Sequence, residues 1–184
     1  MAFDLGSLLR QYTGNNGSSV APADVENHFD QVAQNASPEV VSDGLSAAFR
    51  SDATPPFGQM VGQLFGAGNP NQRAGMLTNL IAGLAPAVLS SLGSGGGGSG
   101  GGLGGILGRL LPGGAGGGAA PTVTADQASR VTPAEVEQIA QHAEQHNPGV
   151  VDRMSGFYAQ HPELIKGLGA AALAIAMGRM ANRS

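Results

Sequence analysis

Side chains that could bind a metal are densest in the stretch from 135 to 146, which contains Glu135, Glu137, His142, Glu144 and His146. His142 and His146 are four residues apart, a spacing that places two imidazoles on one helix face, where they could share a transition metal. Glu144 projects from a different face, and the zincin order, in which a glutamate directly follows the first histidine, is not met. We interpret the group as a solvated polar face and predict no metal ligand. A metal site at His142 and His146 is the alternative.

Other arrangements that support catalysis or cofactor binding do not occur in the sequence. Ser155-Gly156 falls inside a predicted helix, not in the strand-to-helix elbow that exposes a nucleophilic serine. The glycine-rich segment has no Gly-Lys-Ser/Thr ending and follows no strand, so it is not a phosphate-binding loop. His28 falls on an apolar stripe, as a part-buried structural histidine does, and His161 belongs to a predicted turn. We predict no catalytic residue, no cofactor and no small-molecule substrate, and therefore a protein that is not an enzyme.

Composition narrows the classes of partner. The 184 residues include no cysteine, which excludes disulfides, thiolate zinc sites and cysteine nucleophiles. The chain has 9 Lys+Arg and a net charge of -4, whereas affinity for nucleic acid depends on clustered basic side chains. Aromatic residues make up 4% of the chain, which leaves little for base stacking. We therefore expect no nucleic-acid partner.

A pattern in the first half of the chain returns in the second half. VAPADVE at 20–26 is echoed by VTPAEVE at 131–137, PEVV at 38–41 by PGVV at 148–151, LSAAF at 45–49 by MSGFY at 154–158, and PPF at 55–57 by PEL at 162–164. Matches in the same order with small gaps indicate a tandem duplication. The alternative is that both halves reuse common helix-start chemistry. We expect the two copies to pack on each other as a pseudo-symmetric pair.

The repeated unit has the pattern of helices. Prolines at 22, 38, 133, 148 and 162 suit the first turn of a helix, where a missing N–H is not needed. Thr132 is a predicted N-cap with Glu135 as its capping-box partner, and Ser37 and Asn147 are predicted caps. Second helices are expected at 38–50 and 148–160, and a short amphipathic helix at 3–12. The first helices should bury apolar stripes formed by Val25, Phe29, Val32, Val136, Ile139, Ala140 and Ala143.

Small residues recur every four positions in the third element of each copy. The first copy has Gly58, Gly62 and Gly66, and the second has Ala170, Ala174 and Gly178. Each helical glycine is destabilising by about 1 kcal/mol relative to alanine, so a stripe of them predicts a compensating close helix contact. The uncharged run between Lys166 and Arg179 is shorter than the roughly 20 residues that span a bilayer. Polar residues and Pro86 interrupt the longer run at 74–92, so we predict core or interface helices.

A glycine-rich tether separates the copies and contains an apolar island. Positions 94–102 are pure Gly/Ser and 112–120 nearly pure Gly/Ala, as in flexible linkers. The island at 103–111 carries five large aliphatic side chains and one arginine. It either docks on the core, which we favour, or is an interfacial or self-association segment. The predicted organisation is a module with an extra long apolar helix at 1–93, the linker at 94–120 and a second module at 121–184.

The opening FDLGSLL at 3–9 and GLGGIL at 102–107 resemble the YidB-like family of small bacterial proteins. The resemblance implies a cytoplasmic, all-α bacterial protein of unassigned function. The N-terminus also lacks the basic region, apolar run and small-residue cleavage site of a secretory signal, so cytoplasmic location is expected.

Together these features predict an all-α fold of two related three-helix modules without a sheet. The favoured function is a non-enzymatic helical protein that self-associates, as a homo-oligomer, or scaffolds a protein partner. The alternative is a peripheral protein that contacts a membrane surface through 103–111 and the C-terminal helix.

Overall fold

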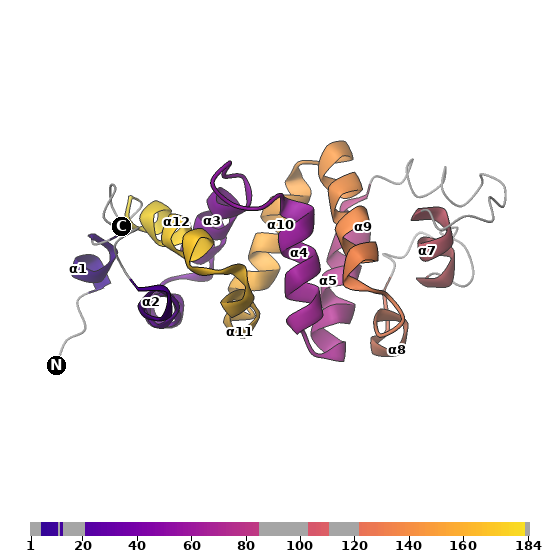
Figure 1. Ribbon diagram of the computed structural model, residues 1–184, viewed down its shortest axis with the longest axis horizontal. Coiled ribbons are helices and arrows are strands. Elements are labelled where there is room, and N and C mark those ends of the chain that lie inside the picture. The colour runs from indigo at the N-terminus through magenta and orange to yellow at the C-terminus, as the bar shows by residue number, and fades with distance from the viewer. Residues whose placement is uncertain (1–4, 11, 13–20, 85–102, 111–121, 183–184) are drawn as a thin grey trace. The chain divides into compact units, whose positions relative to one another are not determined.

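The computed structural model describes residues 5–10, 12, 21–84, 103–110 and 122–182. Within these ranges every regular element is a helix, which confirms the all-α prediction (Figure 1). Residues 13–20 and the Gly/Ser and Gly/Ala stretches of the tether lie outside the described residues.

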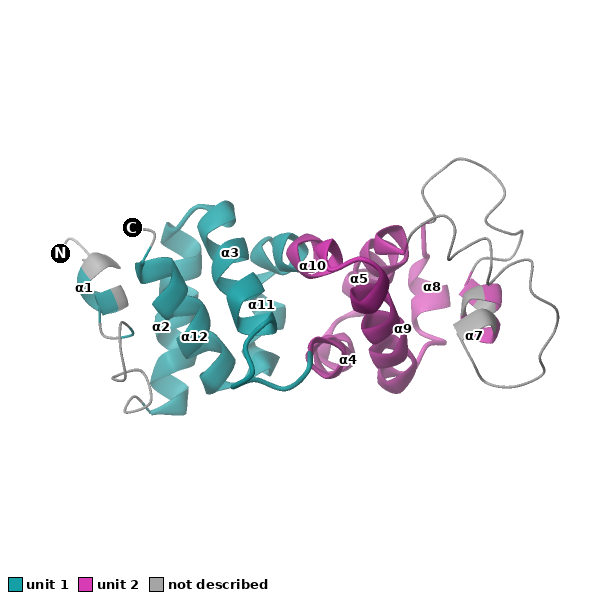
Figure 2. Cartoon of the chain, turned by 90° about the horizontal axis from the view of Figure 1, so that it is seen from above, with its two compact units in different colours: residues 1–56, 155–184 teal, residues 57–154 magenta. Residues whose placement is uncertain are grey.

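The chain divides into two compact units (Figure 2). Unit 1 combines Met1–Pro56 with Ser155–Ser184, and unit 2 is the continuous stretch Phe57–Met154. The ranges 1–93 and 121–184 expected as modules each contribute to both units. Helix α10 (Gly149–Ala159) belongs to both, because the division falls between Met154 and Ser155.

Unit 1 is assembled from helices at the two ends of the chain. Its complete elements are α1 (Leu5–Arg10), α2 (Pro22–Asn35), α3 (Pro38–Phe49), α11 (Pro162–Ile165), the 3-10 helix η2 (Lys166–Leu168) and α12 (Ala170–Ala181). Helix α12 packs along α3 and also contacts α2 and α1. Val25, Phe29 and Val32 of α2 are buried as predicted. The last helix of the chain therefore completes the core that the first helices begin.

Gly169 separates α12 from the short helical turns that precede it. Its φ of 80° lies in the left-handed region, which glycine adopts without a Cβ clash. Helix α11 and η2 end before it, and α12 begins directly after it.

Unit 2 combines the third helix of the first half with the first helix of the second half. Its complete elements are α4 (Phe57–Ala67), α5 (Pro70–Gly83), α7 (Leu103–Leu110), α8 (Ala125–Ala128) and α9 (Pro133–His146). Helix α4 packs along α9, and α5 contacts α4, α8 and α9. The predicted α9 stripe of Val136, Ile139, Ala140 and Ala143 is buried.

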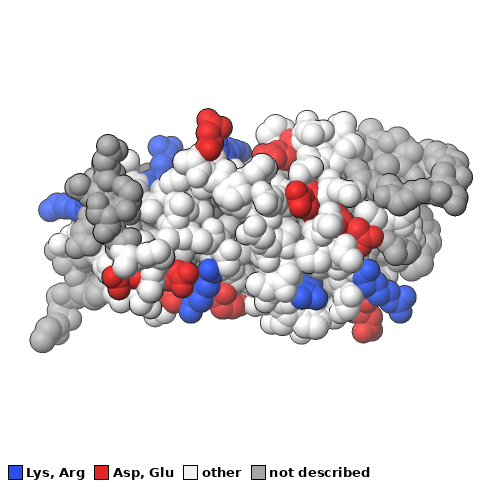
Figure 3. Space-filling model, in the orientation of Figure 1, with Lys and Arg blue, Asp and Glu red and all other residues white. Residues whose placement is uncertain are grey.

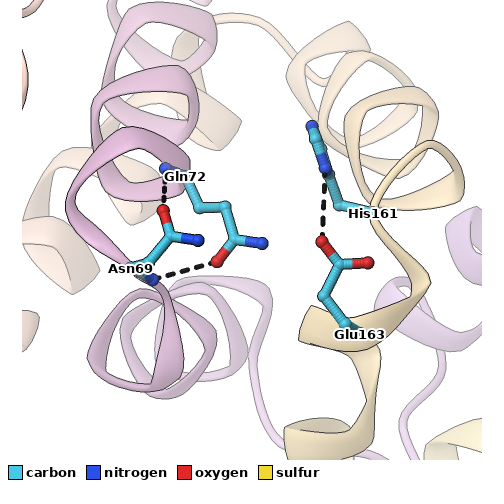
Figure 4. Close-up of polar contacts among 4 residues, drawn as sticks. All are labelled: Asn69, Gln72, His161 and Glu163. Carbon is cyan, nitrogen blue, oxygen red and sulfur yellow. Dashed lines mark hydrogen bonds and ion pairs between the residues drawn. The ribbon is translucent and has the colours of Figure 1, made fainter.

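Helix ends follow capping chemistry at some predicted places and not at others. The Thr132 capping box is confirmed, because its Oγ1 accepts from the Glu135 N–H at 3.3 Å and Glu135 Oε2 accepts from the Thr132 N–H at 2.8 Å. Asn69 and Gln72 form a second box that the sequence analysis missed, with distances of 3.0 and 2.9 Å (Figure 4). The Ser37 cap is wrong, since its side chain makes no capping hydrogen bond. Helix α5 ends at Gly83, within the interrupted apolar run at 74–92, and the part of that run from 85 to 92 lies outside the described residues.

Candidate interaction surfaces

The glycine stripe of α4 lies against α9 within unit 2. A Cβ built on Gly58 would stand 2.8 Å from the Glu137 carbonyl oxygen, and one on Gly62 would stand 2.9 Å from the Pro133 carbonyl oxygen. Both distances are shorter than real Cβ contacts, so these glycines allow the two backbones to approach closely. Gly66 differs, because its Cβ would meet only Pro133 Cγ at 3.6 Å. The close contact predicted for the stripe is present, and its partner is a helix of the same chain.

A shallow hollow of about 290 Å³ runs beside this contact. Its described lining consists of Gln59, Gly62, Gln63, Gly66, Pro133, Ala134 and Glu137. Glu137 is the one ionisable side chain in that set, and its carboxylate accepts a hydrogen bond from Gln141 Nε2 at 3.1 Å. A single part-exposed carboxylate beside two glutamines offers no acid–base pair.

The small-residue face predicted on α12 makes one close backbone contact, at Gly178. A closer contact with α12 is made by Gly44 of α3, which the sequence analysis did not identify. A Cβ on Gly178 would stand 2.9 Å from the Tyr12 carbonyl oxygen, whereas Ala170 and Ala174 are part-exposed. Gly44 of α3 faces α12 more tightly, because its Cβ would stand 2.7 Å from the Ala176 carbonyl oxygen. Its position one residue before Leu45, on the buried side of α3, is the signal that could have identified it.

Helices α3 and α10 meet through two pairs of side chains in unit 1. Ser46 Oγ donates to Ser155 Oγ at 3.0 Å, and the two serines are 6% and 0% exposed. Nearby, the rings of Phe49 and Tyr158 lie 5.8 Å apart. Burial raises the pKa of Tyr158, so its hydroxyl stays protonated at ordinary pH. We call these four residues the α3–α10 seam; the predicted duplication aligns Ser46 with Ser155 and Phe49 with Tyr158.

The apolar island docks on the core, the arrangement favoured from its sequence. Helix α7 contacts α8 and α9, and Ile106 and Leu110 are only 3% and 2% exposed. A Cβ on Gly105 or Gly108 would touch nothing within 4 Å, so neither glycine is required by packing. Residue 111 lies outside the described part of the chain.

The two histidines of α9 come together as their spacing predicts. The rings of His142 and His146 lie 4.3 Å apart and are tilted by 57°. Burial and, second, the neighbouring His146 lower the pKa of His142. Among the described residues no group of three or more His, Cys, Asp or Glu side chains is placed to hold a metal ion. The structure therefore supplies at most two imidazoles at this position.

The remaining histidines have structural partners. His28 Nδ1 lies 2.7 Å from the Tyr12 hydroxyl, and its side chain is part-buried, as the apolar stripe predicted. Burial and, second, Asp24 raise the pKa of Tyr12. His161 lies between α10 and α11, where its Nδ1 is 3.5 Å from Glu163 Oε1 (Figure 4). These contacts fasten loop segments to helices.

Charged side chains of the described residues are scattered among uncharged ones on the face shown in Figure 3. One ion pair in unit 1 joins Lys166 Nζ to Asp30 Oδ2 at 3.0 Å. Both partners are partly exposed, where an ion pair contributes little to stability. No helix in the described ranges has both the length and the apolar character needed to cross a membrane.

Comparison of the chain with family models, with curated proteins and with solved structures finds no match. The resemblance to the YidB-like family and the tandem duplication therefore stay predictions.

Proposed function

We propose that this chain is a non-enzymatic helical protein that associates with further copies of itself. The observation that carries the proposal is how each unit is completed. Helix α12, from the second half of the chain, packs along α3 of the first half, and α4 of the first half packs along α9 of the second. Contacts between separate segments of one chain can also form between two chains, which makes helix exchange a low-cost route to dimers.

The polar groups of the described residues support a structural role. The buried polar residues there are Ser46 and Ser155, which bond to each other, and no buried side-chain polar atom lacks a partner. Catalytic sites commonly hold groups whose ionisation is strongly perturbed inside a cleft. Here the hollow beside α4 and α9 contains glutamine amides and one carboxylate.

Light scattering coupled to size-exclusion chromatography, run over a wide range of protein concentration, tests the proposal. Self-association predicts a mass that rises above the 18.3 kDa of one chain as concentration increases. A mass of one chain throughout the range overturns it.

We do not favour the peripheral membrane alternative, because two of the aliphatic side chains at 103–111 are buried in unit 2. Co-sedimentation with anionic liposomes provides the comparison, with deletion of 103–111 as its control. Loss of pelleting on that deletion would support the membrane alternative instead.

A further inference from the structure

The N-terminal part of unit 1 is joined to the rest of the chain at a single point. Residues 1–56 form unit 1 together with Ser155–Ser184, and the backbone leaves them only after Pro56. No other covalent connection holds the two segments together, since the chain has no cysteine. Residues 1–56 can therefore separate from the partner segment as one piece.

The contact between these two segments is specific in shape. Gly44 allows α12 to approach α3 closely at Ala176. Leu45, Leu173 and Met177 are buried, each at most 1% exposed. A close-packed surface of this kind selects its partner by shape and does not accept a generic apolar helix.

The α3–α10 seam has the character of an interface between two copies of one segment. Ser46 meets Ser155, which is 109 residues further along the chain, and Phe49 meets Tyr158 at the same spacing. The predicted duplication aligns these same pairs. In a two-fold dimer, residues near the axis meet their own equivalents, so the seam repeats within one chain the contacts of an isologous interface.

The loop between α3 and α4 is suited to act as a hinge. The Thr54 hydroxyl donates to the Ala48 carbonyl oxygen at 2.7 Å and to the Ser51 carbonyl oxygen at 2.8 Å. These bonds close the loop on itself. Ala53 N–H donates to Ser51 Oγ at 3.2 Å. All of these bonds are local, and water replaces them when the loop extends. Six residues from Ser51 to Pro56 span up to about 20 Å when extended.

We propose that two copies of this chain associate by exchanging residues 1–56, so that this segment of one copy packs on residues 155–184 of the other. The inference rests on the proposed self-association and names its partner, its contact surface and its hinge. Every contact inside unit 1 is kept in the exchanged dimer, and the hinge loop is the segment that has to extend. Protein concentration and the stability of the closed hinge therefore set the balance between monomer and dimer.

Cysteine pairs placed at the seam report the exchange directly. Full-length Ser46→Cys and Ser155→Cys chains are mixed, unfolded in urea, refolded together and oxidised with glutathione disulfide. No other thiol is present in the chain. Exchange predicts a disulfide between one chain of each kind, in proportion to the dimer fraction measured by light scattering. Ser46→Cys mixed with Gln160→Cys is the matched control, because Gln160 is exposed and directly follows the helix that carries Ser155.

The outcomes separate this inference from the proposed self-association. A dimer whose seam pair cross-links no more than the control pair overturns exchange and leaves self-association standing. A mass of one chain at all concentrations overturns both. The chain carrying both Ser46→Cys and Ser155→Cys should form its disulfide internally in the monomer fraction, which checks that the thiols still face each other.

A hinge variant gives a second test that does not depend on the thiols. Thr54→Val removes the hydroxyl that closes the loop, and each exchanged dimer opens two loops. We expect the dimerisation constant to rise roughly tenfold, while Thr54→Ser, which keeps the hydroxyl, stays close to the unaltered chain. Equal dimerisation constants for the two variants overturn the hinge and with it the exchange.

Discussion

Replacing single glycines along α4 by alanine should change stability with opposite signs on one helix face. At Gly62 the added Cβ would lie 2.9 Å from the Pro133 carbonyl oxygen, in the first turn of α9. That backbone must move by several tenths of an ångström, and overpacking of this kind destabilises by about 1–3 kcal/mol. At Gly66 the nearest atom would be 3.6 Å away, an ordinary contact. At that position alanine introduces no clash, and its higher helix propensity stabilises the helix by up to about 1 kcal/mol.

The gain in propensity also applies at Gly62 and offsets part of the clash. We therefore expect Gly62→Ala to lower the free energy of unfolding by about 1–2 kcal/mol and Gly66→Ala to raise it by up to about 1 kcal/mol. For a unit of this size, 1 kcal/mol shifts the midpoint by roughly 4–8 °C, so the melting temperatures of the two variants should differ by at least about 4 °C.

Both changes in stability are measured by thermal and urea unfolding, followed through the helical circular dichroism signal. The two variants share a helix, a chemical change and a face, so each serves as the control for the other. Equal stability of the two variants would refute the packing of α4 on α9, and so would a stabilised Gly62→Ala.

Three further predictions follow from the same geometry. Gly44→Ala should destabilise unit 1 by about 1–3 kcal/mol, because its Cβ would lie 2.7 Å from the Ala176 carbonyl oxygen. Gly156→Ala is the control: the nearest atom to its Cβ would be 3.8 Å away, so the melting temperature should stay the same or rise slightly. Thr132→Ala breaks a capping box and should lower the free energy of unfolding, measured by urea titration, by about 1 kcal/mol. Ser37→Ala breaks no capping bond and should lower it far less. Equal decreases for the two variants would contradict the cap geometry. The pKa of His142 lies below 6.5, so the folded chain binds its proton less tightly than the unfolded chain. The contribution of His142 to stability is complete above about pH 6.5 and falls as the pH drops through the pKa of the folded chain. The free energy of unfolding, measured by urea titration at high and low pH, should therefore depend less on pH in His142→Gln than in the unaltered chain.

Local features of the fold were predictable because local chemistry decides them. Prolines marked the first turns of α2, α3 and α9, and apolar spacing identified the buried stripe of Val25, Phe29 and Val32. Thr132 and Glu135 formed the capping box that their spacing predicts. Ser37 did not cap, although its residue type and place before a proline suit a cap. The Gly169 break was missed because glycine also occurs inside helices of this chain, such as α4.

The pairing of helices could not be predicted from the same patterns. Apolar stripes identify which face of a helix is buried but not which helix covers it. The partner of α3 depends on the fit of Gly44 to the Ala176 carbonyl, and that of α4 on the fit of Gly62 to Pro133. Such fits need three-dimensional positions. For the same reason the glycine stripes predicted a close helix contact without identifying its partner, which for α4 is a helix of the same chain.

The two units cannot fold at the same time during synthesis, because they draw on different parts of the chain. Unit 2 is one continuous stretch and can fold as soon as α10 begins to emerge. Unit 1 has to wait, because α2 and α3 are synthesised early and α12 near the end. Roughly 120 residues separate the end of α3 from the start of α12, which corresponds to about 6–24 s of synthesis at 5–20 residues per second. Throughout that interval α2 and α3 lack α12, which packs against both helices, so nascent chains on one messenger present matching, uncovered surfaces to each other and to chaperones.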